Sequence, residues 1–175
     1  MKREDAFYYE CLLVLGFFDE YDEWYTSILE SESPLSDIAL ELADCGSDVN
    51  KIISVLQSFR MDQSTDEAAV CNRLRLFLKD TYYSKKMDKS EVVSAMYLLT
   101  SHIGDPGDFD MKLWGSMFYF EYYYSLAKDG ILPFEKVDSA FFAYLDKGIE
   151  IDSQKLWESN TRPTLWERIK RYFTK

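Results

Sequence analysis

The spacing of apolar side chains constrains the fold of this chain more than any other feature. In the segment 17–30, Phe17, Tyr21, Trp24 and Ile28 are separated by four, three and four positions, which places them on one face of a helix. The chain has only seven Gly and four Pro among 175 residues, so it offers few of the tight turns that an all-β domain needs. We therefore predict an all-α fold.

Capping signals divide this pattern into separate helices. Ser33 and Pro34 are suited to the first positions of one helix, and the segment 64–67 and the pair Asp88 and Glu91 read as capping boxes. We predict one domain, 1–175, a bundle of about seven to nine helices. The expected helices cover about 4–15, 17–30, 34–46, 48–59, 64–83, 88–103, 110–128 and 133–147, with a basic amphipathic helix at about 164–175; residues 148–163 are expected to be loosely structured, with at most a short helix near Lys155.

A weak internal sequence repeat is compatible with a second arrangement of these helices. The triplet 53–55 is followed 40 residues later by 93–95, and 45 residues after that by 138–140. Helical repeats of the HEAT type have a period of about 40–47 residues. A helical-repeat layout is therefore an alternative to a simple bundle.

Charge is distributed very unevenly along the chain. Of a net charge of −11, residues 1–50 contribute thirteen Asp and Glu against only Lys2 and Arg3, and no basic residue occurs from Glu4 to Asp48. A field of this sign attracts cationic partners and repels nucleic acid and anionic membranes. We expect a basic protein partner, and no binding to nucleic acid or membrane.

The densest acidic feature is a ridge in the third expected helix. Asp37, Glu41, Asp44 and Asp48 are separated by four, three and four positions, which places them on one face of a helix, with Asp48 beyond the helix end. We expect no Lys or Arg three or four positions away to relieve the repulsion between these carboxylates. A solvated face that keeps the protein soluble is the alternative interpretation. Tyr25, one step off the apolar stripe of the preceding helix, is expected to be an exposed aromatic anchor. The predicted partner-binding residues are Asp19, Asp22, Glu23, Tyr25, Asp37, Glu41, Asp44 and Asp48.

Residues able to carry out chemistry are isolated from one another in the sequence. His102 is the only histidine and is expected to be structural, near a helix C-terminus. An EF-hand frame starting at Asp110 fails because Lys112 and Trp114 occupy ligand positions, and Glu121 at its end is expected to have a structural role among aromatic residues. Without a Gly-rich phosphate loop or a nucleophile motif, we predict a non-enzyme with no catalytic residue, cofactor or metal. A hydrolase using clustered carboxylates is a less favoured alternative.

The cysteine pattern and the hydropathy of the chain indicate the cellular compartment in which we expect the protein. Cys11, Cys45 and Cys71 are widely spaced and form no CxxC motif, as in proteins of a reducing cytosol, where thiols act as small hydrophobes. No stretch reaches the roughly 20 apolar residues of a membrane helix, and we see no signal peptide. We expect a cytoplasmic monomer or dimer whose basic terminal helix packs on its own domain.

Two segments resemble a known class of proteins. The stretch LSDIALELADCGSDVNKIISVLQSF, residues 35–59, and more loosely ILPFEKVDSAFFAYL, residues 131–145, are similar to small acidic helical immunity proteins of bacterial polymorphic-toxin and contact-dependent-inhibition systems. The resemblance covers well under half of the chain and carries no individual residue over. It implies a stoichiometric inhibitor that binds a cognate, often basic, toxin domain. A helical adaptor or nucleic-acid mimic that binds another basic partner is the alternative.

Overall fold

The computed structural model describes residues 1–61, 64–104 and 110–157, and within these ranges every regular element is a helix. This confirms the predicted all-α fold. The nine helices of the described residues are α1 (Arg3–Val14), α2 (Phe18–Ser31), α3 (Asp37–Asp44), α4 (Val49–Met61), α5 (Glu67–Tyr83), α6 (Lys89–Ile103), α7 (Met111–Lys128), α8 (Phe134–Lys147) and α9 (Ser153–Trp157).

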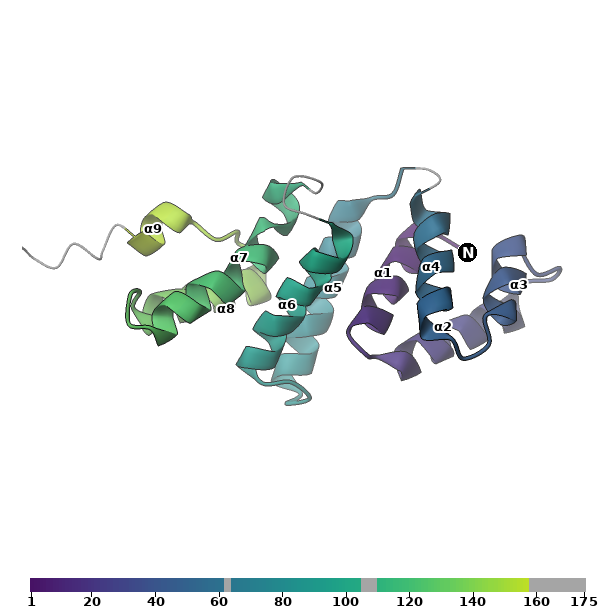
Figure 1. Ribbon diagram of the computed structural model, residues 1–175, viewed down its shortest axis with the longest axis horizontal. Helices are drawn as coiled ribbons and strands as arrows, with labels where there is room; N and C mark the ends of the chain where they lie inside the picture. Colours follow the sequence, from purple (N-terminus) through teal and green to yellow (C-terminus); the bar gives the residue numbers. More distant parts are fainter. Residues whose placement is uncertain (62–63, 105–109, 158–175) are drawn as a thin grey trace, which may run out of the picture.

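The helices form a single domain that is longer in one direction than in the others (Figure 1). At one end, α1 packs along α4 and against α2, while α3 packs on α4 at the outer edge. The helices α5 and α6 lie in the middle, and α7 and α8 lie side by side toward the other end, near α9. The packing partners do not recur at the period of the weak sequence repeat, because α4 packs on α1 and α3 whereas α6 packs mainly on α7.

Two apolar clusters hold these helices together, one in the middle of the molecule and one at the end formed by α1 to α4. The larger cluster gathers side chains from α1 and from α5 to α8, among them Phe7, Trp114 and Phe141, which are fully buried. The aromatic helix α7 contributes Trp114, Met117 and Phe120 to this cluster, and the indole N–H of Trp114 donates to Glu67 at 3.1 Å. The smaller cluster holds α1 to α4 together, with the side chains of Ala6, Leu13, Tyr21, Leu42, Ile52 and Leu56 at its centre.

Two predicted helix starts are wrong by two or three residues. The Ser33–Pro34 peptide bond is cis, and α3 begins only at Asp37. The preceding residue, Ser36, donates its N–H and its hydroxyl to the Glu32 carboxylate. Likewise, Asp66 rather than a residue at 64 caps α5, since its side chain accepts from the Ala69 N–H. In both places a side chain other than the predicted cap accepts a backbone N–H near the helix start, which moves that start along the chain.

The predicted start of α6 is confirmed at atomic detail. The Asp88 carboxylate accepts from the Glu91 N–H at 2.9 Å, and the Glu91 carboxylate accepts from the Asp88 N–H at 2.6 Å. The predicted helix at 164–175 lies outside the described residues. Among the residues that are described, no helix combines the length and the apolar character needed to cross a bilayer.

Candidate partner-binding surface

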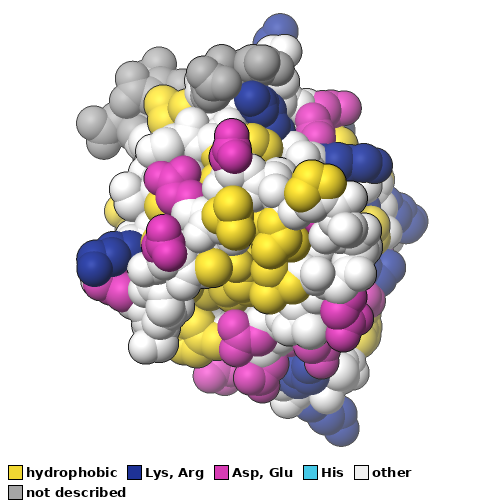
Figure 2. All heavy atoms as spheres, turned by 90° about the vertical axis from the view of Figure 1, so that its right-hand side faces the viewer, with side chains coloured by type: hydrophobic (Ala, Val, Ile, Leu, Met, Phe, Trp, Pro, Cys, Tyr) yellow, Lys and Arg dark blue, Asp and Glu magenta, His cyan; other side chains and the backbone are white. Residues whose placement is uncertain are grey.

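The acidic residues of α2 and α3 point to solvent because the apolar stripes of both helices face the core. In α2, Tyr21 and Ile28 are buried, whereas Asp22 and Glu23 are exposed. Figure 2 looks onto this end of the molecule and shows apolar side chains gathered at its centre with Asp and Glu on several sides. We call the exposed carboxylates of Asp19, Asp22, Glu23, Asp37, Glu41 and Asp44 the acidic surface.

The carboxylates of the acidic surface have no ion-pair or hydrogen-bond partner for their side chains among residues 1–61, 64–104 and 110–157. Some carboxylates elsewhere are paired: Asp5 binds Arg73 at 2.7 Å, and Asp138 binds Lys89 at 2.8 Å. Within the part of the chain that the structure describes, the acidic surface therefore carries an uncompensated negative field, which favours encounter with a cationic partner.

The structure corrects the sequence interpretation at Asp48. This residue lies beyond the end of α3, and its carboxylate accepts from the Lys51 N–H at 3.2 Å at the start of α4. The Lys51 ammonium also pairs with it at 3.6 Å, three residues along the chain. The expectation that no basic residue lies at helical spacing from the ridge is thus wrong at Asp48, whereas it holds for the three ridge residues within α3.

Tyr25 is not the exposed anchor that the sequence predicts. Its side chain is half-buried, its hydroxyl donates to the Ala39 carbonyl at 2.7 Å, and its ring stacks on Tyr21 with centroids 5.9 Å apart. The reason is that α3 folds back beside α2, so the tyrosine hydroxyl finds a backbone acceptor there. Tyr25 therefore links α3 to α2 and is only partly exposed.

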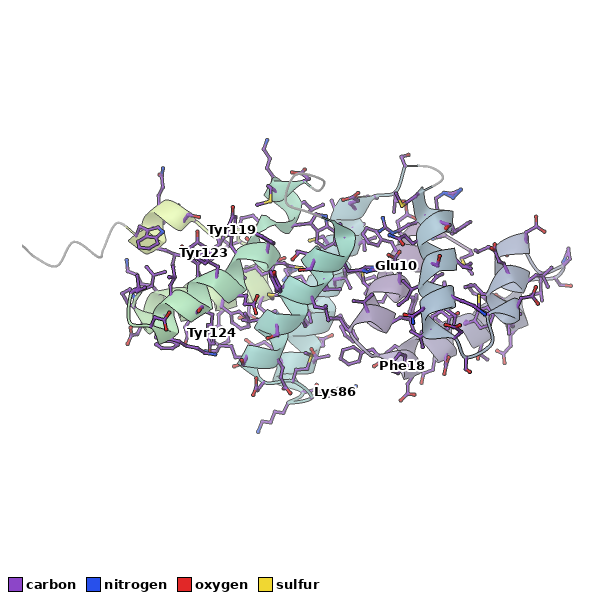
Figure 3. All side chains as sticks on the ribbon, in the orientation of Figure 1. Glu10, Phe18, Lys86, Tyr119, Tyr123 and Tyr124 are labelled. Carbon is purple, nitrogen blue, oxygen red and sulfur yellow. The ribbon has the colours of Figure 1, made fainter. Side chains whose placement is uncertain are left out.

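Beside the acidic surface lies a hollow of about 270 Å³ between α1, α2 and the α3–α4 turn, which we call the α2 hollow. Its floor is apolar, formed by buried Leu13, Tyr21 and Leu42. Its mouth includes Asp22 and the ring of Phe18, which is 47% exposed and lies at the start of α2 (Figure 3). Sequence reasoning missed Phe18, although a large apolar residue off the buried stripe of α2 is itself a signal of an exposed contact.

A second group that sequence reasoning missed is centred on Glu10, which is fully buried. The Arg60 guanidinium donates to Glu10 Oε2 at 2.6 Å, and His102 Nε2 lies 2.7 Å from Glu10 Oε1, so the carboxylate joins α1, α4 and α6 (Figure 3). Arg60 also stacks over the Phe7 ring at 4.0 Å. The signal was present, since Glu10 is the one acidic residue in an apolar run. This arrangement is that of a structural ion-pair cluster.

The remaining residues that could carry chemistry are dispersed. Cys11 and Cys71 are buried, Cys45 is half-buried, and all three are free thiols. Glu121 is half-buried beside Tyr97 and Tyr122 and has no side-chain partner in the part of the chain that is described. Among those same residues, no three His, Cys, Asp or Glu side chains are arranged to hold a metal ion.

Comparisons of this chain with protein-family models, with curated proteins and with solved structures find no match. The chemistry of the acidic surface and of the α2 hollow is therefore interpreted from their own residues. Both lie at the same end of the molecule, because Asp22 belongs to the acidic surface and also lines the α2 hollow.

Proposed function

We propose that this chain is an immunity protein that neutralises a cognate, basic toxin domain by binding it through the acidic surface. The observation that carries the proposal is the row of exposed carboxylates on α2 and α3 without partners among the described residues. Asp37, Glu41 and Asp44 repeat at helical spacing with no cation beside them among residues 1–61, 64–104 and 110–157, an arrangement that costs helix stability unless a partner supplies the charge.

The surroundings of these carboxylates also favour a protein partner over a small ion. Leu29 of α2 and Leu40 of α3 are 41% and 50% exposed, and Figure 2 shows apolar side chains between the carboxylates at this end. Protein interfaces combine apolar contacts at their centre with a polar and charged rim. Carboxylates in such a rim steer a basic partner toward the surface and raise its association rate.

A helical adaptor or nucleic-acid mimic would use the same carboxylates on a different basic partner. The experiment that separates these functions is a growth assay in which the chain is co-expressed with the product of the neighbouring gene. We expect that product to arrest growth when expressed alone, and the chain to restore growth. A neighbouring product that is harmless, or an arrest that the chain does not relieve, would overturn the immunity function.

A matched pair of variants tests whether the acidic surface is responsible. The triple variant Asp37→Lys, Glu41→Lys and Asp44→Lys should fail to restore growth. The control variant Asp80→Lys, Asp129→Lys and Glu135→Lys changes the net charge by the same amount at exposed positions outside α2 and α3 and should protect like the unaltered chain. Equal protection by both variants would contradict the proposed surface.

A further inference from the structure

We infer that the α2 hollow binds a single arginine side chain of the basic partner. This inference rests on the proposed function, which requires that the partner be basic. It adds a defined binding site for one side chain to the broader acidic surface. The hollow measures about 270 Å³, just below the roughly 300–1,000 Å³ of pockets for drug-sized ligands. A space of this size suits one long side chain.

The hollow is apolar at its floor and acidic at its mouth, which matches an arginine side chain with its apolar stem and its charged end. Leu13, Leu42 and Ile52 in the floor are at most 6% exposed and match the methylene stem. At the mouth, Phe18 and Asp22 are four residues apart on α2 and are therefore neighbours on one face of the helix. Together they offer an aromatic ring for stacking and a carboxylate for paired hydrogen bonds.

The protein already binds two of its own arginines in this way. Arg60 lies over the Phe7 ring at 4.0 Å while it donates to Glu10 at 2.6 Å. Arg73 lies over the Tyr8 ring at 3.7 Å while it donates to Asp5 at 2.7 Å. The α2 hollow has the ring and the carboxylate, but none of its lining residues is basic.

Charge at the mouth favours arginine over an apolar side chain. An apolar occupant would remove water from Asp22 without replacing its hydrogen bonds, which is costly for a carboxylate. Burial raises the pKa of Tyr25, which lines the hollow, and the charges of Cys45 and Asp44 are smaller causes of the same rise. Arginine is preferred over lysine because the guanidinium is planar, stacks on rings and loses its hydration more readily.

The test uses N-acetyl-arginine amide as a probe and N-acetyl-citrulline amide as its uncharged counterpart of nearly the same shape. Each is titrated into the ¹⁵N-labelled full chain, and backbone amide shifts are followed. We expect the arginine probe to give saturable shifts centred on Phe18, Asp22 and Ser47. The citrulline probe should bind about tenfold more weakly, the factor that corresponds to one charge-assisted hydrogen bond.

Three variants locate the site. Asp22→Asn should remove the preference for arginine over citrulline, whereas Asp19→Asn, an equal loss of charge on the same helix, should keep it. Ser47→Tyr, which adds a ring at the exposed rim of the hollow, should weaken both probes at least tenfold while the amide spectrum remains that of a folded protein.

Several results would overturn the inference. These are shifts that spread over the acidic surface without saturating, equal binding of the two probes by the unaltered chain, and unchanged binding in Ser47→Tyr. The proposed function fails separately, in the growth assay. Protection that is abolished by the triple lysine variant but unaffected by Ser47→Tyr would leave the acidic surface in place and refute the arginine site.

Discussion

Glu10 is a buried carboxylate whose two oxygens are both used, Oε2 by Arg60 at 2.6 Å and Oε1 by His102 at 2.7 Å. Removing one partner from a buried ion pair leaves an uncompensated charge, which costs about 3–5 kcal/mol. We therefore expect Glu10→Ala to lower the free energy of unfolding in urea by about that amount. Glu23→Gln, an exposed carboxylate on α2, should change it by less than about 0.5 kcal/mol. Equal effects of the two substitutions would contradict the structural role of Glu10.

The three thiols should differ in reactivity. Burial raises the pKa of Cys71 to about 12 and that of Cys11 well above its usual value, whereas Cys45 is half-buried and its pKa is raised less, again by burial. Because the thiolate is the reactive form, we expect iodoacetamide at pH 8 to modify only Cys45 in the folded protein. All three thiols should react in urea. Rapid modification of Cys71 without denaturant would show that α5 is not buried as described.

At the scale of the element, the capping box of α6 offers a test of local structure. Asp88 and Glu91 each satisfy a backbone N–H of the other residue, and loss of an N-cap side chain costs about 0.5–2 kcal/mol. Asp88→Ala should lower the free energy of unfolding by about 1 kcal/mol, measured by urea denaturation followed by circular dichroism. Asp80→Ala, at an exposed position in the last turn of α5 where its side chain caps no helix start, serves as the control and should have almost no effect.

The helices were predictable because their determinants are local. The stripe of Tyr21 and Ile28 and the capping box of α6 each involve residues within one or two turns of helix. The start of α3 was less accurate because the Glu32 carboxylate, which binds Ser36, lies outside the motif, and the start of α5 was less accurate because Asp66 caps the helix in place of Ser64. Element type therefore follows from spacing, whereas element boundaries depend on which acceptor is closest in three dimensions.

The candidate site was predictable only in part, for the same reason. Exposure of the acidic surface follows from its position opposite the apolar stripes, so Asp37 and Glu41 could be assigned to it from sequence. The roles of Tyr25 and Glu10 depend on partners 14 and 92 residues away, Ala39 and His102. The α2 hollow likewise combines residues of α1, α2 and α4, a combination that no local pattern records.

At the scale of the whole molecule, the acidic surface should contribute little to folding. Replacing Asp37, Glu41 and Asp44 by lysine substitutes one set of like charges for another. None of the three substitutions removes an ion pair within the described residues. We expect the far-UV circular dichroism spectrum and the melting temperature of this triple variant to stay close to those of the unaltered chain. A large drop in melting temperature would show that the carboxylates stabilise the fold and are not reserved for a partner.

The central claim is that the carboxylates of α2 and α3 steer a basic protein partner onto this end of the molecule. The most direct test is the association rate with the purified product of the neighbouring gene, measured by stopped flow from low to physiological salt. Steered association is fast at low salt and slows as salt screens the charges. We expect the triple lysine variant to associate at least tenfold more slowly at low salt and to lose this salt dependence, while the Asp80, Asp129 and Glu135 control retains it. Equal rates and equal salt slopes for the unaltered chain and a folded triple variant would show that the acidic surface is only a solvated face.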